Sequence, residues 1–352
     1  MKKSILEMKK KNNPLITVVI PCYHVEDVIG CVFSDLKKQS FSDFEMVFVN
    51  DGGGEKMSTI LGAFAENDDR VIKVEKSNGG ASSARNAGLK IAHGEWVVFV
   101  DPDDRVEPYY LQSLYDSVAG TKSDVGIGGF RQKDVRSGEL QDFRMQENKK
   151  EISLAKCYHT FYGYQASVLW NKIYNVDFLL KNNLYLDETI TFAEDLDFNL
   201  CVFQKIETIG ICADCGYWYI VAGTSATNRY HAHLAEYLRK TDRKEFELLR
   251  KFGISEIELH TKAIRQSTNR AFFLVVNCFK SGNGMNLQQK VKKISDDVLQ
   301  DKILMDNLIS DQCKYGLKID ICAFLIVHRQ IWMLVILFAF LYKIKYVIEK
   351  FQ

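Results

Sequence analysis

The stretch Trp96-Val97-Val98-Phe99-Val100-Asp101-Pro102-Asp103-Asp104 joins an apolar run directly to three carboxylates. A short apolar run bounded by turn-forming residues is typical of a buried β-strand. Three carboxylates this close repel one another unless a cation or hydrogen-bond donors offset their charge. Mg²⁺ or Mn²⁺ suits this role, because one or two carboxylates hold such an ion while phosphate oxygens and water complete its shell. The stretch therefore predicts a strand that ends at a metal-diphosphate site, with a solvated acidic turn as the alternative.

Upstream of this stretch, apolar runs alternate with helical patterns. Strands are predicted over residues 16–20, 44–49, 71–74 and 96–100, and helices over residues 27–39, 55–66 and 82–92. Such an alternation predicts an α/β fold with a mostly parallel sheet flanked by helices. Ligands of open α/β sheets bind beyond the carboxyl ends of the strands, so the residues that follow each strand are the candidates for a site.

The residues that follow the first two predicted strands are polar and turn-forming. Pro21-Cys22-Tyr23 follows the first strand, and Asn50-Asp51-Gly52-Gly53-Gly54 follows the second. The glycines permit close approach of a flat or phosphorylated ligand, and the Asp51 carboxylate can accept an N–H from a nucleobase. A plain turn is the alternative, because Asp-Gly is also ordinary turn chemistry.

A glycine-containing loop precedes the helix predicted from residue 82. It runs Ser77-Asn78-Gly79-Gly80-Ala81, and the helix carries Arg85 and Asn86 in its first turns. A helix N-terminus with an arginine nearby suits a diphosphate or the acidic cluster itself. Serine capping accounts for Ser82 and Ser83 without any ligand.

Composition narrows the class of protein. The chain has 352 residues with 46 basic and 45 acidic side chains, and this balance gives no global reason to expect nucleic-acid binding. Nine cysteines without regular spacing fit reduced thiols in a cytoplasmic protein. Cys212-Ala213-Asp214-Cys215 has no second cysteine pair nearby, which favours ordinary strand-end cysteines over a zinc site. Residues 1–13 form a polar, lysine-rich tail without the apolar centre of a signal peptide.

Several segments carry a family resemblance through their order and spacing. They are Val18-Val19-Ile20-Pro21-Cys22-Tyr23, Val49-Asn50-Asp51-Gly52, Asn78-Gly79-Gly80, Ala84-Arg85-Asn86-Ala87-Gly88, Phe99-Val100-Asp101-Pro102-Asp103-Asp104, Trp170-Asn171-Lys172-Ile173-Tyr174 and Phe192-Ala193-Glu194-Asp195-Leu196-Asp197-Phe198. Together they resemble the inverting family 2 glycosyltransferases, which have a GT-A nucleotide-diphosphosugar-binding fold. The last two resemble elements of members that assemble bacterial capsular and exopolysaccharides. The resemblance covers residues 14–222, and it departs from the family's usual Asp-Asp-Gly-Ser at Asn50-Asp51-Gly52-Gly53.

The resemblance implies a UDP-sugar donor and a role for each matching residue. Asp51 would contact the uracil edge, Asp101 the ribose or the metal shell, and Asp103 would be the principal ligand of Mg²⁺ or Mn²⁺. Asp195 would be the base that activates the acceptor hydroxyl, with Glu194 as its neighbour or substitute. The remaining residues implied in donor binding are Pro21, Tyr23, Gly79, Arg85, Asn86 and Asp104.

Inverting sugar transfer explains why two kinds of group are needed. A metal screens the charge that grows on the leaving diphosphate, and a separate carboxylate takes the proton of the attacking hydroxyl. Glu194 and Asp195 also suit plain helix N-terminal charge, which is the alternative for this pair. Trp170 is expected in the core rather than in the site.

Beyond residue 222 the pattern changes to charged helical segments, such as residues 233–252 and 256–279, so residues 223–318 are expected to form a helical region. Residues 319–352 are apolar and then basic: the apolar runs Ile321–Val327 and Ile331–Tyr342 are separated by His328-Arg329-Gln330. Neither run reaches the roughly 20 residues that cross a membrane. An in-plane or re-entrant membrane helix is predicted, with a buried core helix as the alternative.

A membrane-associating tail fits a lipid-linked saccharide acceptor, and Lys343, Lys345 and Lys350 beside the apolar runs favour anionic lipid. The expected location is therefore cytoplasmic, at the inner face of the cell membrane. Two other functions stay open at this point. A non-catalytic nucleotide-sugar-binding or scaffold protein has the same fold, and a sugar nucleotidyltransferase shares the α/β pattern but would favour a glycine-rich, basic loop near its N-terminus.

Overall fold

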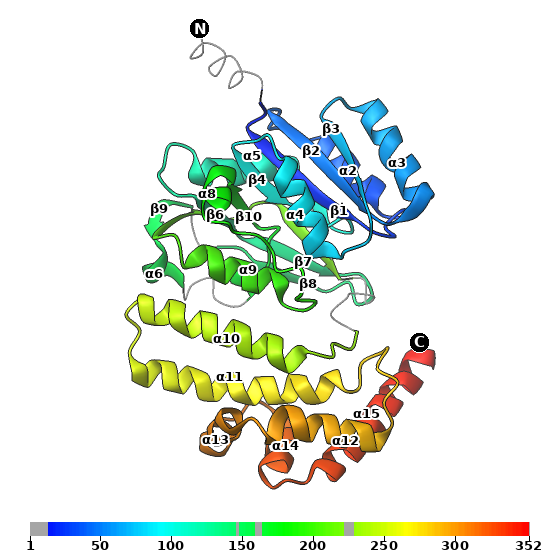
Figure 1. Ribbon diagram of the computed structural model, residues 1–352, viewed down its shortest axis with the longest axis vertical. Helices are drawn as coiled ribbons and strands as arrows, with labels where there is room; N and C mark the ends of the chain where they lie inside the picture. Colours follow the sequence, from blue (N-terminus) through cyan, green and yellow to red (C-terminus); the bar gives the residue numbers. More distant parts are fainter. Residues whose placement is uncertain (1–12, 146–147, 159–163, 222–228, 352) are drawn as a thin grey trace. The chain divides into compact units, whose positions relative to one another are not determined.

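The computed structural model describes residues 13–145, 148–158, 164–221 and 229–351, and the chain divides into two compact units, residues 1–222 and 223–352 (Figure 1). The polar tail predicted at residues 1–13 lies outside the described residues, apart from Asn13. Residue 222 itself also lies outside them.

The first half of unit 1 alternates strands and helices as predicted. The strands are β1 (Ile16–Cys22), β2 (Phe44–Asp51), β3 (Val71–Lys76) and β4 (Trp96–Phe99), and the helices between them are α2 (Ile29–Lys37), α3 (Gly54–Asn67) and α4 (Ala81–Ile91). These four strands are parallel neighbours in the order β3-β2-β1-β4. β1 and β2 are buried along their whole length, which explains why they read as unbroken apolar runs rather than alternating ones.

Four further strands extend the sheet beyond β4. In spatial order they are β10 (Lys172–Asn175), β6 (Val125–Gly128), β11 (Thr208–Cys212) and β9 (Lys149–Ser153). β10 runs antiparallel to β4 and β6, whereas β11 is parallel to β6, so the sheet is mixed and mostly parallel. The helices of this half are α5 (Tyr110–Val118), α6 (Leu154–Cys157), α7 (Tyr164–Ser167), α8 (Val176–Lys181) and α9 (Glu194–Phe203). The predicted α/β fold is confirmed.

A second, smaller sheet begins directly after the acidic tetrapeptide. Its strands, in spatial order, are β5 (Arg105–Val106), β12 (Tyr217–Val221), β7 (Phe130–Asp134) and β8 (Leu140–Phe143). Alternate residues of β12 face the core: the Tyr217 and Tyr219 rings stack on Trp170 at centroid distances of 4.3 Å and 5.7 Å. Trp170 is therefore a core residue, as expected from its type.

Helix α4 lies against β1 because of a glycine. A Cβ added at Gly88 would come within 2.3 Å of Val19 Cγ1, which is closer than side-chain carbons approach. The absent side chain lets the helix backbone pack directly on the strand. This contact fixes the part of α4 that carries Arg85.

Unit 2 is helical. It contains α10 (Leu234–Lys251), α11 (Glu256–Asn277), α12 (Leu287–Ile294), the π-helical turn η3 (Ser295–Leu299), α13 (Lys302–Ser310), α14 (Leu317–Val327) and α15 (Ile331–Phe351). α11 starts at a capping box in which Ser255 and Glu258 satisfy each other's backbone N–H, and it packs against α10, α13 and α14 (Figure 1).

The two apolar runs at the end of the chain form α14 and α15, which contact each other, and α15 also contacts α12. Ile331, Leu334, Val335 and Phe338 of α15 are buried at the spacing of one helical face. Among the residues described, no helix is long and apolar enough to cross a membrane. The core-helix alternative thus accounts for one face of α15.

Candidate active site

The polar strand ends meet where the order of the sheet reverses. The chain proceeds from β1 outward to β3 and then returns to place β4 on the other side of β1. In open α/β sheets such a switch point leaves a crevice beyond the carboxyl ends of the two diverging strands. Pro21 and Tyr23 lie at the end of β1 and Asp101 follows β4, so both segments lie at this crevice.

A buried arginine joins the two acidic segments of the site. The Arg85 side chain on α4 donates from Nη2 to Asp101 Oδ1 at 2.7 Å and from Nη1 to Asp195 Oδ1 at 3.1 Å. Glu194 Oε1 lies 4.0 Å from the same Nη1. Only 5% of Arg85 is exposed, and burial by itself would lower its pKa, but the three carboxylates more than compensate and raise it. Arg85 is therefore held charged between Asp101 and Asp195.

Asp195 is an unusual carboxyl group. It lies in the first turn of α9, which starts after Ala193 in a left-handed conformation with φ of 60°. Desolvation raises the pKa of Asp195 to about 7, against the opposing effect of Arg85 and with further repulsion from Glu194 and Asp101. A carboxylate with a pKa near neutrality is well matched to accepting a proton from a hydroxyl group.

The three carboxylates of the acidic tetrapeptide point to different places. The Asp101 side chain is 25% exposed beside Arg85, and Asp103 is exposed to solvent. Neighbouring protein atoms and the negative charge of Asp101 raise the pKa of Asp103. Asp104, which the sequence analysis placed at the donor, is instead buried: it accepts from the Tyr217 hydroxyl at 2.7 Å and from the Ile220 N–H at 2.8 Å.

Asp104 and Tyr217 therefore hold the loop in place. The Tyr217 oxygen also accepts the Asp101 N–H at 3.2 Å, so one hydroxyl fixes both ends of the tetrapeptide. Motif reasoning missed Tyr217, because it comes from β12, more than a hundred residues downstream. The only signal for it in the sequence is the aromatic run that starts there.

The acidic loop fits a divalent cation of one particular kind. In the part of the chain that the structure describes, no three His, Cys, Asp or Glu side chains gather into a metal-binding cluster. Mg²⁺ and Mn²⁺ do not need such a cluster when phosphate oxygens complete their shell. Asp101 and Asp103 have accessible carboxylates whose mutual repulsion a cation would relieve.

Asp51 binds the glycine loop. Its carboxylate accepts from the backbone N–H groups of Gly79 at 2.9 Å and Gly80 at 2.7 Å, and pairs with Lys76 Nζ at 2.5 Å. Asp51 was expected to contact uracil. In the structure it is 2% exposed, and its carboxylate is already bonded to protein groups. Lys76 was not identified from the sequence, where it is an ordinary strand-end lysine.

Asn50, where the sequence departs from the family pattern, has a local role. Its Oδ1 accepts the Gly53 N–H at 2.8 Å, and its Nδ2 donates to Glu75 Oε2 at 2.7 Å. The amide supplies both a donor and an acceptor, which a carboxylate cannot do at neutral pH. The departure from the family pattern therefore preserves the turn that carries Asp51.

The other predicted donor residues differ in accessibility. Tyr23 is 49% exposed, whereas Pro21 is buried at the end of β1. Gly79 lets the loop pack closely on the start of α4, since a Cβ there would lie 2.7 Å from Ser83 Oγ. Asn86 was expected at the donor but is buried and tied to Leu186, donating to its carbonyl at 2.9 Å and accepting its N–H at 2.9 Å. Asn86 thus connects α4 to the segment before α9.

The fold is the GT-A fold of sugar transferases, with a switch-point crevice beside the carboxylates of Asp101 and Asp195. Residues 17–173 match the family model described as glycosyl transferase family 2. The chain is 29% identical over 290 residues to the uncharacterized glycosyltransferase EpsJ of Bacillus subtilis, which covers 80% of this chain and 83% of EpsJ. These matches show a glycosyltransferase, and its residues 17–173 resemble family 2.

Other relatives are named as transferases that act on poly(ribitol-phosphate). The chain is 26% identical over 282 residues to the poly(ribitol-phosphate) beta-N-acetylglucosaminyltransferase TarS of Staphylococcus aureus, which covers 79% of this chain but only 47% of TarS. The crystal structure of S. aureus TarS 1-349 in complex with UDP-GlcNAc superposes with a TM-score of 0.60 at 22% identity, covering 83% of this chain and 80% of that one. This likeness shows the fold. The match to glycosyltransferases disfavours the nucleotidyltransferase alternative, and metal-dependent nucleotide binding tests the scaffold alternative on the same fold.

Proposed function

We propose that this enzyme transfers a sugar from a UDP-sugar donor to a hydroxyl group of a lipid-linked saccharide, with inversion, in the synthesis of a cell-surface polysaccharide. The observation that carries the proposal is the Arg85 guanidinium, which joins Asp101 on the donor side to Asp195 on the acceptor side. A single displacement needs these two functions side by side, because the leaving group departs as the hydroxyl attacks.

The donor side is assigned to the crevice at β1, β2 and β4. The exposed Tyr23 ring offers a flat surface for a nucleobase, and Asp51 holds the exposed Gly79–Gly80 loop through two backbone N–H groups. UDP as the nucleotide is supported by the TarS structure, whose title names UDP-GlcNAc. Asp103 and Asp101 would hold Mg²⁺ or Mn²⁺, which when bound screens the charge of the leaving diphosphate.

The acceptor side is assigned to Asp195. Desolvation raises the pKa of this carboxyl group to about 7, which matches it to accepting the proton of the attacking hydroxyl near neutral pH. Arg85 keeps the carboxylate oriented through its 3.1 Å hydrogen bond. Glu194, at the start of the same helix, adds negative charge that raises the basicity of Asp195.

Contact with the membrane is assigned to the outer face of α14 and α15. While one face of α15 is buried, Trp332, Met333, Ile336 and Phe340 on the opposite side are between 50% and 61% exposed. Phe324 of α14 is also exposed, and so are Arg329 and Lys343. An apolar face flanked by basic residues suits the interface of an anionic membrane, and a lipid-linked acceptor would be presented there on the cytoplasmic side.

The first experiment measures UDP release from UDP-glucose, UDP-galactose and their N-acetylated forms, with Mg²⁺ or Mn²⁺, with and without a membrane-lipid extract. Turnover by the native enzyme that is lost in both Asp103→Asn and Asp195→Asn supports the proposal. Asp177→Asn is the matched control, because Asp177 is an exposed aspartate in the first turn of another helix, α8. Absence of turnover together with absence of metal-dependent UDP binding would overturn the UDP-sugar assignment.

A further inference from the structure

One face of the small sheet points away from the core. Neighbouring residues in register point to the same face of a sheet, so the pairing of Trp218 with Arg105 on one side and Arg131 on the other places all three together. Ile220, Lys133 and Leu140 form the next row by the same rule. Tyr217 and Tyr219, which alternate with them along β12, stack on Trp170 instead. This outer face is therefore not part of the core.

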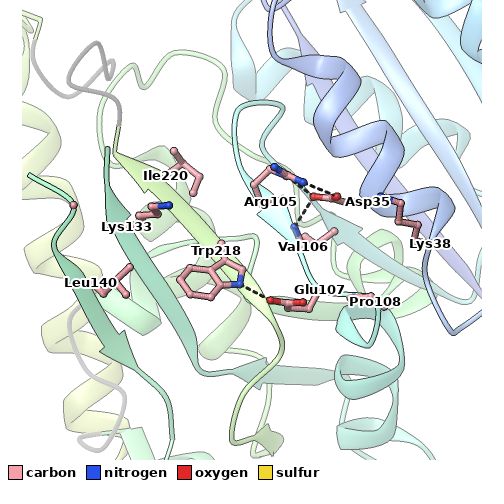
Figure 2. A pocket seen from close by; sticks show the side chains of 11 residues that line it. Asp35, Lys38, Arg105, Val106, Glu107, Pro108, Lys133, Leu140, Trp218 and Ile220 are labelled. Atoms are coloured by element: carbon pink, nitrogen blue, oxygen red, sulfur yellow. Dashed lines mark hydrogen bonds and ion pairs between the residues drawn. The ribbon is translucent and has the colours of Figure 1, made fainter. Parts of the chain in front are cut away.

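The outer face forms the floor of a cavity. The cavity has a volume of about 820 Å³, and its opposite wall comes from the end of α2 and from the loop after β5 (Figure 2). Figure 2 shows Trp218, Lys133 and Leu140 on the sheet side and Asp35 and Lys38 across from them, with Arg105 of β5 bonded to Asp35. Pockets that hold ligands of several rings have volumes of this order, roughly 300–1,000 Å³.

The charged side chains that line the cavity sum to one net positive charge: Lys38, Lys133 and Arg105 against Asp35 and Glu107. Asp35 accepts from Arg105 Nη2 at 2.8 Å, and Glu107 accepts the Trp218 indole N–H at 2.9 Å, so both acids have partners. Lys38 and Lys133 are exposed and make no ion pair with any residue that the structure describes. The lining therefore attracts an anionic group.

The same lining offers flat and apolar surface to a sugar. Trp218 is partly exposed, its indole is oriented by the bond to Glu107, and Arg131 lies 5.1 Å from its ring. The C–H faces of sugar rings are apolar while their hydroxyl rims are polar, which matches an aromatic ring surrounded by charged hydrogen-bonding groups. Leu140, which is 62% exposed, extends the apolar part of the floor.

Two backbone connections link the cavity to the acidic tetrapeptide, residues 101–104. Arg105 directly follows Asp104, and the Ile220 N–H that holds Asp104 belongs to the β12 strand of the floor. We propose that this cavity binds an acidic saccharide segment of the acceptor, away from the hydroxyl that receives the sugar. The proposal rests on the proposed function, because it assumes a saccharide acceptor.

The test measures binding of oligosaccharides of four to eight residues, prepared as separate acidic and neutral fractions from the surface polysaccharide of the cells that make this protein. Affinity is measured by calorimetry on the full chain and on Lys38→Glu/Lys133→Glu and Trp218→Ala. Lys122→Glu/Lys205→Glu is the matched control, since these exposed lysines of unit 1 lie outside the cavity and the charge change is identical. UDP binding is measured in parallel for every variant.

We expect the acidic fraction to bind to the native chain. Its affinity should be at least about tenfold lower in both cavity variants and unchanged in the control. UDP binding should stay at the native level in all variants. Equal binding of neutral and acidic fractions, an equal loss in the control, or no binding to the native chain would overturn the proposal. If the native chain does not bind UDP, this result counts against the proposed function. The saccharide measurements would still decide the role of the cavity.

Discussion

A single side chain, Arg85, supplies the positive charge shared by Asp101 and Asp195, with Glu194 nearby. Arg85→Met keeps an unbranched apolar stem and removes the guanidinium group with its charge. We expect kcat/KM to fall by about 100-fold or more, as when other preorganised charged donors are removed from active sites. Lys90→Met is the control, because Lys90 is an exposed cation at the other end of the same helix. Equal activity of the two variants would remove Arg85 from the site.

The pKa of Asp195 predicts a pH profile. A base acts when ionised, so with a pKa of about 7 the enzyme should lose kcat/KM about tenfold for each pH unit below neutrality. The charge of Glu194 raises this pKa, and Glu194→Gln should therefore shift the acidic limb of the profile toward lower pH. The measurement is kcat/KM from pH 5 to pH 9 for both proteins. An acidic limb that does not move in the variant contradicts the coupling.

Much of the candidate site could be predicted from the sequence alone. Asp101, Asp103, Arg85 and Asp195 could be singled out because each lies beside a strand end or a helix start in a short motif. Asn86 and Asp104 occur in the same motifs but face inward, and a motif does not show which way a side chain points. Burial decides their roles, and burial depends on residues far along the chain, such as Leu186 and Tyr217.

At the scale of elements, the contact of α4 with β1 depends on Gly88. Gly88→Ala places a Cβ against Val19 and should lower the free energy of unfolding by about 1–3 kcal/mol, the usual range for overpacking. Val19→Ala in the same chain removes the clashing methyl groups, so the double variant should lose less than the sum of the single losses. Urea denaturation of the four proteins measures this coupling. Simple additivity would show that the helix does not depend on this contact.

The link between β12 and the acidic loop predicts a second effect. Tyr217→Phe removes the hydroxyl that holds Asp104 and the Asp101 N–H, so metal-dependent UDP binding should weaken about tenfold, within the range for a lost buried hydrogen bond. Tyr110→Phe is the matched control, because the Tyr110 hydroxyl is equally buried and donates to the Trp170 carbonyl at 2.6 Å. If both variants weaken UDP binding equally, Tyr217 has only a general role in stability.

Elements before residue 100 were predictable because each apolar run is long enough to identify a strand, and because apolar residues recur at helical spacing in each helix. β10 and β12 were harder to assign, because Lys172 and Tyr217 are buried in the core, which their residue types alone do not indicate. Lys172 is fully buried, and desolvation lowers its pKa well below the ordinary lysine value. Its ammonium group donates to the Gln165 carbonyl at 2.8 Å, a contact that only the folded chain provides.

At the scale of the whole molecule, the exposed apolar face of unit 2 predicts membrane binding. Trp332→Ser/Ile336→Ser should reduce cosedimentation with phosphatidylglycerol vesicles severalfold, because both side chains lie on the outer face of α15. Ile257→Ser/Ile303→Ser is the control: these residues of unit 2 are 81% and 73% exposed but lie on α11 and α13. Equal loss in both double variants would indicate unspecific hydrophobic adsorption, and unchanged binding would exclude α15 as the contact.

The shared arginine has a consequence for the order of events. A donor and its cation bound at Asp101 would offset the negative charge beside the Arg85 guanidinium. The same guanidinium also contacts Asp195. We therefore predict that the donor binds first, because its cation changes the surroundings of the proposed base Asp195. In initial-rate kinetics UDP should then compete with the donor but not with the acceptor, and an acceptor offered alone should find an enzyme not yet prepared to use it.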